Sequence, residues 1–530
     1  MKSVFELRLP ATTSQGYPFS LHGMRGRLRS FKRREDGALL IFGIVLFVLM
    51  TMLGGLAVDL MRYEQRRTEL QQTLDRSVLA AAAINQQLDP EAVVNDYFDK
   101  AGLSEYLHDV KAETGLNYRT VTASAKSTLK PFFMQMIGIN SLTPAAASGA
   151  EQRISNIEVS LVLDISGSMR GSRIDNLRPA AREFVTAVLG SSSPGRVSIS
   201  IIPYNAQVNI GRPMMNSFNV DANHDSSSCI ELPDSVFSSI DLSTTTKFRH
   251  NAHFDPYYTR SGASSLLYNC PPQSGNEVVA LSQSTTELHN SIDSLYADGN
   301  TSIDVGVKWG ALLLNHNANS VVSDLVTAGE VEAVFNNRPL DAGSIQTLKV
   351  LVVMTDGQNT TEYKIDDPYN SGLSNIWRND ENGRVSVYFN RSGSYDWWWP
   401  RTGGWNTYRD GGNSDSRQLE WPEVWEEYSV RYVAQYFYAN ALGHSSSSWQ
   451  NAFMDWVSST KNSRLQQICS AAKADGIVVY GIGFEAPTNG RNQLRACATT
   501  DSHYFDASGL EITSAFRAIA NNISQLRLTQ

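Results

Sequence analysis

Side chains that carry oxygen occupy three short segments that lie far apart in this 530-residue chain. Asp164, Ser166 and Ser168 form an Asp-x-Ser-x-Ser pattern, Thr301 ends a Gly-Asn-Thr segment, and Asp356 is the centre of a Thr-Asp-Gly segment. Carboxylates and hydroxyls are hard ligands, and two carboxylates with three hydroxyls suit Mg²⁺, with Mn²⁺ and Ca²⁺ as alternatives. The sequence therefore predicts a metal site made by these five residues, and its chemistry favours recognition over catalysis.

The Asp-x-Ser-x-Ser pattern has a local alternative, because Asp and Ser also favour turns and helix N-termini. The surroundings of the three segments favour the metal site. The pattern follows the apolar run Ile157–Leu163, Thr301 follows the helix-like Ser284–Leu295, and Asp356 follows the strand-like Leu348–Met354. Ligands of open α/β sheets bind beyond the carboxyl ends of strands, which is where Asp164 and Asp356 should lie.

From residue 154 onward, strand-like and helix-like segments alternate. Val197, Ile199 and Ile201 alternate with polar residues as in a strand, whereas the apolar residues between Leu177 and Val188 have helical spacing. This alternation predicts an α/β fold for residues 154–530, with an open, doubly wound and mostly parallel sheet.

Two stretches, at about 211–280 and 358–463, are too long for connecting loops and are predicted to be insertions. The second leaves from the Asp356 segment, so we expect it beside the metal. The first follows an expected edge hairpin, and we expect it at the other end of the sheet. Nine of the ten tryptophans lie between Trp377 and Trp456. They form either the core of the second insertion or an exposed aromatic patch for a partner.

The N-terminal part carries a candidate membrane anchor. Residues 38–58 contain no charged side chain and are long enough to span a bilayer as a helix. Residues 1–36 contain eight Lys or Arg, which predicts a basic cytoplasmic tail and an exported C-terminal part. A cleaved signal peptide is the alternative, but the run is too long for one, and no small-x-small cleavage site directly follows it.

The remaining N-terminal segments divide into three predicted parts. The anchor itself should occupy residues 37–60, and its helix should continue outside the membrane over residues 61–87, where Asp89-Pro90 ends or kinks it. Residues 88–153 should form a small α+β region, because Tyr118–Ser127 alternates roughly as a strand does.

All four cysteines follow the anchor, which agrees with export. Four cysteines allow three pairings. We favour the pairs nearest in sequence, Cys229 with Cys270 and Cys469 with Cys497, each of which would contribute about 3–4 kcal/mol in the chain-entropy model. Four free buried thiols are the alternative.

Composition and motifs argue against other function classes. The net charge of −8 gives no sign of nucleic-acid binding. An aspartyl phosphatase would need a second Asp where Ser166 lies, and the chain has no His-Gly-Thr element and no Walker-type loop. We therefore expect a protein that is not an enzyme.

The five candidate ligands resemble the metal-ion-dependent adhesion site of von Willebrand factor A domains. That resemblance implies the Rossmann-like A-domain version of the sheet for residues 154–530. It also implies that the two carboxylates act on the ion mostly through water, and that one coordination position stays open for an acidic side chain of a protein partner.

The two ends of the chain resemble TadG-type proteins of the Tad (Flp) pilus assembly system. The resemblance is carried at the N-terminal end by Arg33–Ala38, Val58–Leu60 and Ala80–Ala83, and at the C-terminal end by Cys469–Gly476 and Tyr480–Phe484. It implies an accessory protein that crosses the bacterial inner membrane once. Its C-terminal domain would face the periplasm and bind a pilus or envelope component.

Two expectations qualify that resemblance. Pilins of this class carry Glu five residues after the Gly at which the peptidase cuts, and the matching position after Gly37 is Phe42. We therefore predict no processing by prepilin peptidase. The alternative function is an A-domain protein that serves another envelope complex or is released as a surface adhesin.

Overall fold

The computed structural model describes residues 36–83, 88–114, 118–153, 156–190, 194–271, 275–341 and 347–524. The chain divides into two compact units. The first comprises Met1–Glu113 and Thr120–Glu151, and the second comprises Thr114–Arg119 and Gln152–Gln530. The predicted cytoplasmic tail lies almost entirely outside the described residues.

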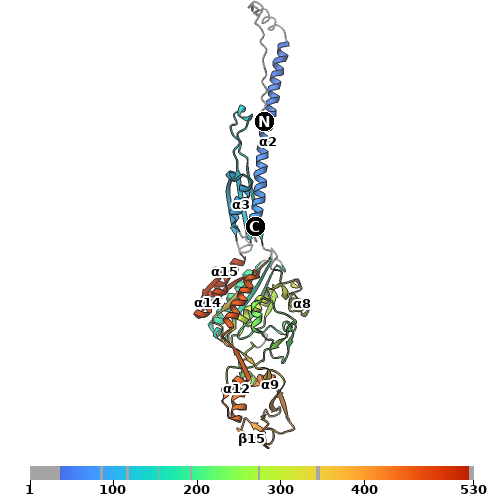
Figure 1. Ribbon diagram of the computed structural model, residues 1–530, viewed down its shortest axis with the longest axis vertical. Coiled ribbons are helices and arrows are strands. Elements are labelled where there is room, and N and C mark those ends of the chain that lie inside the picture. The colour runs from blue at the N-terminus through green and yellow to red at the C-terminus, as the bar shows by residue number, and fades with distance from the viewer. Residues whose placement is uncertain are drawn as a thin grey trace, which may run out of the picture. The chain divides into compact units, whose positions relative to one another are not determined.

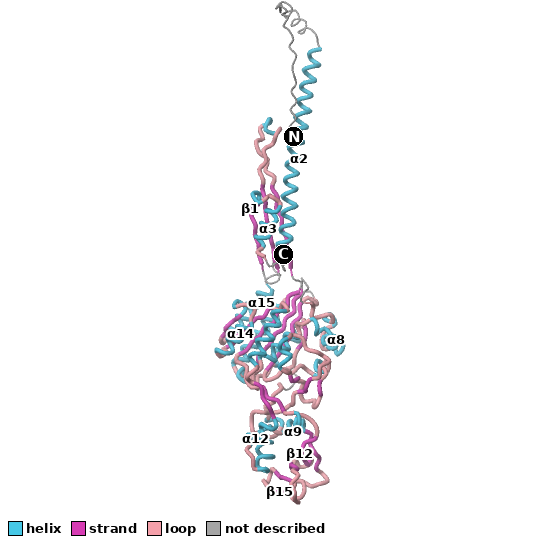
Figure 2. Tube along the Cα trace, viewed as in Figure 1, coloured by secondary structure: helices cyan, strands magenta, loops and turns pink. Residues whose placement is uncertain are grey.

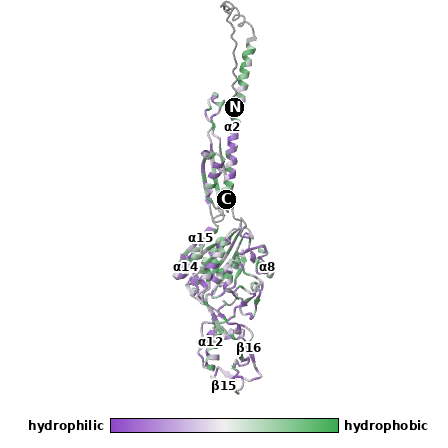
Figure 3. Cartoon of the chain, viewed as in Figure 1, coloured by the Kyte–Doolittle hydropathy of each residue, from purple (hydrophilic) through white to green (hydrophobic). Residues whose placement is uncertain are grey.

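The first unit is organised around one long helix, α2 (Asp36–Ala81). Its first half is apolar and exposed, as the green upper part of α2 in Figure 3 shows. Within the described part of the chain, it is the one helix long and apolar enough to cross a membrane. The helix passes from the predicted anchor into the polar half without a break, and residues 84–87, where we expected it to end, lie outside the described residues.

The C-terminal half of α2 packs against a small layer made of one helix and a three-stranded sheet. The helix α3 (Pro90–Lys100) begins after Asp89, whose carboxylate accepts a hydrogen bond from the Ala92 N–H at 3.0 Å. A three-stranded sheet has the order β1-β2-β3. Its strands are β1 (Leu107–Thr114), β2 (Tyr118–Lys126) and β3 (Ala145–Arg153). The core between these elements comprises Leu70, Leu74, Val78, Val94, Phe98 and Val121, among others.

The second unit contains a six-stranded sheet with the order β19-β18-β10-β4-β5-β9. Five strands are parallel, and β9 at one edge is antiparallel to β5. The strands are β4 (Asn156–Asp164), β5 (Val197–Tyr204), β9 (Val279–Ser282), β10 (Thr347–Thr355), β18 (Val478–Phe484) and β19 (Tyr504–Ala507). This is a mixed α/β unit with a mostly parallel sheet, as the alternating pattern predicts.

Helices cover both faces of this sheet, and Figure 2 shows them flanking the magenta strands. One core lies under α4 (Ser172–Leu189), α6 (Thr285–Ser294) and α15 (Glu511–Ser524). The other lies under α7 (Ile303–Leu312), α8 (Asn319–Ala328), α13 (Lys461–Ala474) and α14 (Thr488–Cys497). Alternate side chains of a strand point to opposite faces, so Val350 and Val352 enter the first core whereas Leu351 and Val353 enter the second.

The first insertion leaves the sheet at the carboxyl end of β5 and returns as β9. Our expectation that it lies at the other end of the sheet is wrong. Tyr204, the last residue of β5, is in register with Asp164, and because β9 is antiparallel to β5 the connection stays at that end. The insertion contains α5 (Arg212–Met215), β6 (Val220–Asp221), β7 (Ile230–Glu231) and β8 (Phe248–His250).

The second insertion begins directly after β10 and has a core of its own. Its ends pair as β11 (Glu362–Ile365) with β17 (Met454–Val457). Between them, a five-stranded sheet has the order β15-β14-β13-β12-β16. These strands and the flanking helices are β12 (Leu373–Asn379), β13 (Val385–Tyr388), β14 (Trp397–Trp399), β15 (Gly404–Asn406), β16 (Ser416–Glu420), α9 (Trp421–Glu427) and α12 (Ser446–Phe453). Figure 1 shows α9, α12 and β15 gathered in one lobe.

Three of the nine tryptophans between Trp377 and Trp456 belong to the buried core of the second insertion. Trp398, Trp421 and Trp425 are buried, and the rings of Trp421 and Trp425 stack with their centroids 5.2 Å apart. Trp456, on the pairing strand β17, is exposed. The sequence allowed either a core of the second insertion or an exposed aromatic patch, and the three buried rings agree with the core.

Two disulfides close loops within the second unit. Cys229 pairs with Cys270 across 41 residues of sequence, and Cys469 pairs with Cys497 across 28 residues. The first lies within the first insertion and the second joins α13 to α14. These are the pairs that we favour from the sequence.

Candidate metal centre

The two carboxylates predicted to bind a metal lie at the ends of neighbouring parallel strands. Asp164 is the last residue of β4, and Asp356 follows the last residue of β10. The register pairs Leu163 with Met354, so the chain leaves both strands at the same edge. Asp164 and Asp356 are far apart in the sequence, and the pairing of β4 with β10 brings them together.

Hydrogen bonds join the two strand ends directly. Thr355 donates its hydroxyl to Oδ2 of Asp164 at 2.5 Å, and the Ser166 N–H donates to Oδ1 of Asp164 at 2.7 Å. The Ser168 hydroxyl donates to Oδ1 of Asp356 at 2.6 Å and lies 3.1 Å from the Ser166 hydroxyl. Four of the five predicted ligands are therefore joined by one continuous hydrogen-bond network.

The fifth predicted ligand, Thr301, comes from the loop before α7. Its backbone is fixed by Thr360, whose hydroxyl accepts from the Thr301 N–H at 2.8 Å and whose N–H donates to the Thr301 carbonyl at 2.9 Å. A Cβ atom built on Gly357 would lie 3.5 Å from Oγ1 of Thr301. The Thr301 hydroxyl therefore faces the segment that holds Asp356.

The Thr301 loop is also held against the Asp164 loop. The Gly167 N–H donates to the Gly299 carbonyl at 2.8 Å, and a Cβ atom at Gly167 would approach that carbonyl oxygen to 3.2 Å. The Asp298 N–H donates to the Ile165 carbonyl at 2.8 Å. Glycine at position 167 allows this close approach, and all three predicted segments meet at the carboxyl edge of the sheet.

The centre is largely buried but opens on one side. The side chains of Asp164, Ser166, Thr301 and Asp356 are buried, whereas Ser168 is exposed. Burial, and then the charge of Asp356, raises the pKa of Asp164 to about 7. Burial also raises the pKa of Asp356, although Ser168 and Arg173 oppose it. The two carboxylates are therefore costly to keep ionised together without a further positive charge.

One arginine that sequence reasoning missed supplies part of that charge. Arg173, on the first turn of α4, donates through Nη1 to Oδ2 of Asp356 at 2.7 Å and through Nε to Glu485 at 2.9 Å. About a third of its side chain is exposed, so solvent weakens its effect. No local pattern marks Arg173, because both partners lie far away in sequence.

The donor set fits a hard divalent cation. Two carboxylates and three hydroxyls meet at one edge, and in the part of the chain that the structure describes the carboxylates have one partly exposed arginine as a nearby counter-charge. Among the described residues, no group of three His, Cys, Asp or Glu side chains is arranged to hold a metal. Any ion here would therefore depend on hydroxyl oxygens and water as well as carboxylates, which is the ligand preference of Mg²⁺.

A second group of charges, which we call the buried ion cluster, lies beside the Thr301 loop. It consists of Asp304, Glu362, Lys461 and Arg464, all buried. Arg464 contacts Glu362 at 3.0 Å and Asp304 at 3.6 Å, and Lys461 contacts Asp304 at 3.5 Å. Lys461 also donates to the hydroxyl of Ser302, the residue after Thr301. The cluster joins α7 and α13 to β11 at the base of the second insertion.

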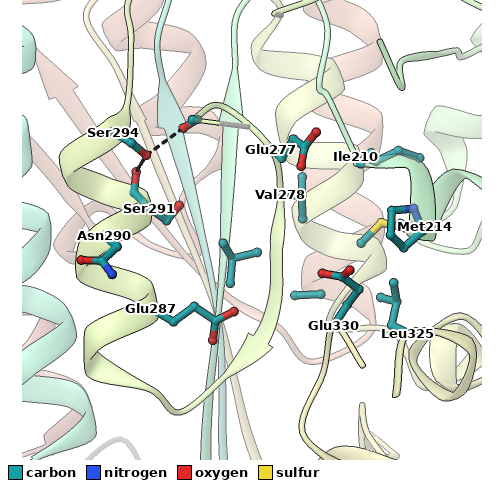
Figure 4. A pocket seen from close by; sticks show the side chains of 15 residues that line it. Ile210, Met214, Glu277, Val278, Glu287, Asn290, Ser291, Ser294, Leu325 and Glu330 are labelled. Carbon is teal, nitrogen blue, oxygen red and sulfur yellow. Dashed lines mark hydrogen bonds between the residues drawn. The ribbon is translucent and has the colours of Figure 1, made fainter. Parts of the chain in front are cut away.

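Separate from the metal centre, a cavity of about 430 Å³ lies between α5, β9, α6 and α8 (Figure 4). Its lining includes Glu277, Glu287 and Glu330, and none of the five predicted ligands. Burial, and then the charge of Glu330, raises the pKa of Glu277. Glu287 accepts a hydrogen bond from Ser282 at 2.6 Å.

Three solved structures similar to this chain belong to pilus proteins. The vWF domain of the type V pili tip protein Mfa5 from Porphyromonas gingivalis is 13% identical, with 71% of this chain and 97% of that chain covered and a TM-score of 0.32. The pilus adhesin SpaC from Lactobacillus rhamnosus GG is 13% identical, with 78% and 33% covered and a TM-score of 0.30. The pilus adhesin RrgA from Streptococcus pneumoniae is 10% identical, with 76% and 47% covered and a TM-score of 0.30.

These TM-scores are too low for the likenesses to establish a fold or a function for this chain. The chain spans only 33% of SpaC and 47% of RrgA. No curated protein matches the chain. The N-terminal segment does match a known family: residues 37–83 fit the family described as putative Flp pilus-assembly TadE/G-like. This segment, which covers most of α2, is therefore related to Tad pilus assembly proteins.

Proposed function

We propose that this chain is a membrane-anchored accessory protein of Tad (Flp) pilus assembly or adhesion, and that its α/β unit binds an acidic group of a protein partner through a divalent cation. The observation that carries the metal-dependent part is the meeting of three distant segments around two buried carboxylates. The pilus context is supported by the family match of residues 37–83.

The proposed ligands are Asp164, Ser166, Ser168, Thr301 and Asp356, in the manner of the adhesion site of A domains. A bound Mg²⁺ would supply the positive charge that attracts a partner carboxylate, with Mn²⁺ and Ca²⁺ as alternative ions. Asp164 and Asp356 would compensate the ion's charge, and the hydroxyls would complete the oxygen set. Ser168 is the exposed member, so we expect the partner to approach from its side.

We also propose that α2 anchors the protein in a membrane with a defined orientation. Residues 38–58 of α2 would cross the bacterial inner membrane once, the basic N-terminal tail would stay in the cytoplasm, and the α/β unit would face the periplasm. An oxidising periplasm agrees with two disulfides in that unit. We propose no catalytic residue and no nucleic-acid partner for this chain.

The direct test is calorimetric titration of Mg²⁺ into the metal-free, full-length protein held in detergent. We expect saturable binding by the wild type and loss of that binding in the Asp164→Ala/Ser166→Ala variant. Asp175→Ala is a matched control, because Asp175 lies on the nearby α4 helix and its side chain is exposed. The control should bind Mg²⁺ as the wild type does.

A partner test follows from the binding test. Purified Tad pilus components would be captured by the wild type in Mg²⁺, and capture should be lost in a chelator and in the Asp164→Ala/Ser166→Ala variant. Capture that persists unchanged in both conditions would overturn metal-dependent recognition. Saturable Mg²⁺ binding by the double variant would overturn the ligand assignment itself.

A further inference from the structure

A hairpin in the first unit reaches the end of the predicted membrane span. We call residues 129–142 the hairpin tip. It lies between β2 and β3 and is closed by the bridge of Leu129 with Leu142, whose backbones exchange hydrogen bonds of 2.8 and 2.9 Å. In Figure 1, the hairpin runs alongside α2 with its tip directed toward the apolar half of that helix.

One buried carboxylate fixes the hairpin tip to α2. Asp59, directly after the uncharged run, accepts three backbone hydrogen bonds, from the N–H groups of Phe132 at 2.8 Å, Phe133 at 2.7 Å and Met134 at 2.8 Å. Three such bonds to an ionised group are strong and directional. The tip is therefore held at a defined level along the helix.

Two ring contacts strengthen this attachment. A Cβ atom at Gly55 would lie only 2.3 Å from the Phe133 ring, so the ring rests on the helix backbone where glycine leaves room. The Arg62 guanidinium lies 4.0 Å from the centroid of the Phe132 ring. Residues on successive turns of α2 thus hold successive residues of the tip.

The hairpin tip exposes several large apolar side chains. Its sequence from Pro131 to Asn140 contains no charged residue. The exposed fractions are 66% for Phe132, 67% for Met136, 54% for Ile137 and 40% for Ile139. Four large apolar side chains on one short tip are more than scattered surface residues require.

The level of the tip along α2 coincides with the expected boundary of the bilayer. Gly55 lies three residues before the end of the uncharged run at Val58, which is about 4.5 Å along a helix. Lys130, at the base of the tip, is exposed, and Arg62 is partly exposed. Basic side chains at this level are placed to meet lipid phosphates while their neighbours contact acyl chains.

We propose that the hairpin tip is a second membrane contact, which inserts Phe132, Met136, Ile137 and Ile139 into the lipid surface beside the point where α2 leaves the bilayer. The inference rests on the proposed anchor. Lipid is the occupant that the structure favours, because the exposed apolar tip continues the exposed apolar surface of the span. Asp59 acts as the positioning residue that sets the depth of the tip.

The test places a fluorescent label at single introduced cysteines in the full-length protein. The four native cysteines are paired, so a label reacts with the new one. Ile137→Cys reports on the tip, Phe47→Cys on the middle of the span, and Asp96→Cys on the exposed surface of α3. Each protein is placed in nanodiscs that hold one chain each and contain lipids with a quencher on the acyl chains.

We expect a strong loss of fluorescence at positions 47 and 137 and none at position 96. Quenching at position 47 with none at 137 would overturn the lipid contact and leave the anchor standing. Absence of quenching at both positions would overturn the anchor and the lipid contact together. One chain in each disc removes contacts with a second copy, so an occupant of that kind could not protect the label.

The positioning role of Asp59 has its own variant. Asp59→Asn replaces one accepting oxygen by a donor, so the tip should loosen and quenching at position 137 should fall while quenching at position 47 is unchanged. Asp75→Asn is the matched control, because Asp75 lies on the same helix and accepts a hydrogen bond from Ser148 at 2.6 Å. Equal quenching in both variants and the wild type would overturn this role.

Discussion

The candidate metal centre and the buried ion cluster each bury two carboxylates in the same unit, and they balance those charges differently. In the cluster, Lys461 and Arg464 lie among Asp304 and Glu362, and all four are buried. Burial alone would raise the pKa of Glu362, but Lys461, Lys364 and Arg464 lower it. In the candidate metal centre, the pKa of Asp164 is raised to about 7.

This difference in charge balance indicates where the protein could bind an external cation. The cluster carries two acids and two bases, so the protein itself balances the charge, although Asp304 still has a raised pKa because of its burial. The candidate metal centre carries two acids, three hydroxyls and one partly exposed arginine. A divalent ion would supply the positive charge that the protein's own side chains do not provide there.

The largest expected effect is loss of a base from the buried ion cluster. Arg464→Met should lower the free energy of unfolding by about 3–5 kcal/mol, because it leaves Glu362 and Asp304 buried without the base that contacts both. Denaturant unfolding of the metal-free protein measures it. Arg517→Met is the control, since Arg517 forms an exposed pair with Glu183, and should change the stability by about 0–1 kcal/mol. Equal effects of the two variants would remove the contrast between cluster and surface.

The second prediction concerns pH in the absence of metal. The folded-state pKa of Asp164, about 7, exceeds its ordinary value of 3.8, so the folded protein binds a proton more tightly than the unfolded chain. Stability from this residue is present at low pH and is lost as pH rises from about 4 to 7, at up to about 1.4 kcal/mol per pH unit.

Unfolding at a series of pH values in a chelator would show this loss. Glu231, whose burial raises its pKa to about 7, adds a slope of the same sign, so the decisive quantity is the difference between wild type and Asp164→Asn. The variant should be less sensitive to pH. Identical slopes for the two proteins would contradict the assignment of an uncompensated charge to Asp164.

The third prediction concerns removal of the metal. At an Mg²⁺ concentration about 100 times the dissociation constant, the wild type should gain about 2.7 kcal/mol of stability over its form in a chelator. Asp356→Asn should lose most of this gain, and Asp175→Asn should keep it. A gain of the same size in Asp356→Asn would show that Mg²⁺ acts elsewhere in the protein.

The smallest expected effect belongs to Arg173, which partly compensates Asp356. Arg173→Ala should raise the affinity for Mg²⁺ roughly fivefold, since a partly exposed ion pair is worth about 1 kcal/mol. Calorimetry of the metal-free protein measures the change. Arg182→Ala on the same helix is the control, because its partner is the exposed Asp293. A weaker affinity in Arg173→Ala would mean that Arg173 orients Asp356 more than it competes with the ion.

Local patterns were enough to predict the elements that position the candidate site. The apolar runs Ile157–Leu163 and Leu348–Met354 are buried neighbouring strands, and the alternation of strands and helices yields a mixed α/β unit. The uncharged run of residues 38–58 lies in a single long helix, and the favoured cysteine pairs are the ones present. These features follow from the periodicity and spacing of residues along the sequence, together with the known geometry of parallel strands.

Tertiary structure alone decided which distant residues meet. Arg173 reaches Asp356 and Glu485, the buried ion cluster joins three separate segments, and Asp59 holds the hairpin tip. The first insertion lies at the carboxyl end of β5 because β9 runs antiparallel, a direction that its short apolar run does not reveal. Residue types and local spacing thus determined the strands, helices and candidate ligands. Charge balance and contact partners depend on long-range packing, in which residues far apart in sequence become neighbours.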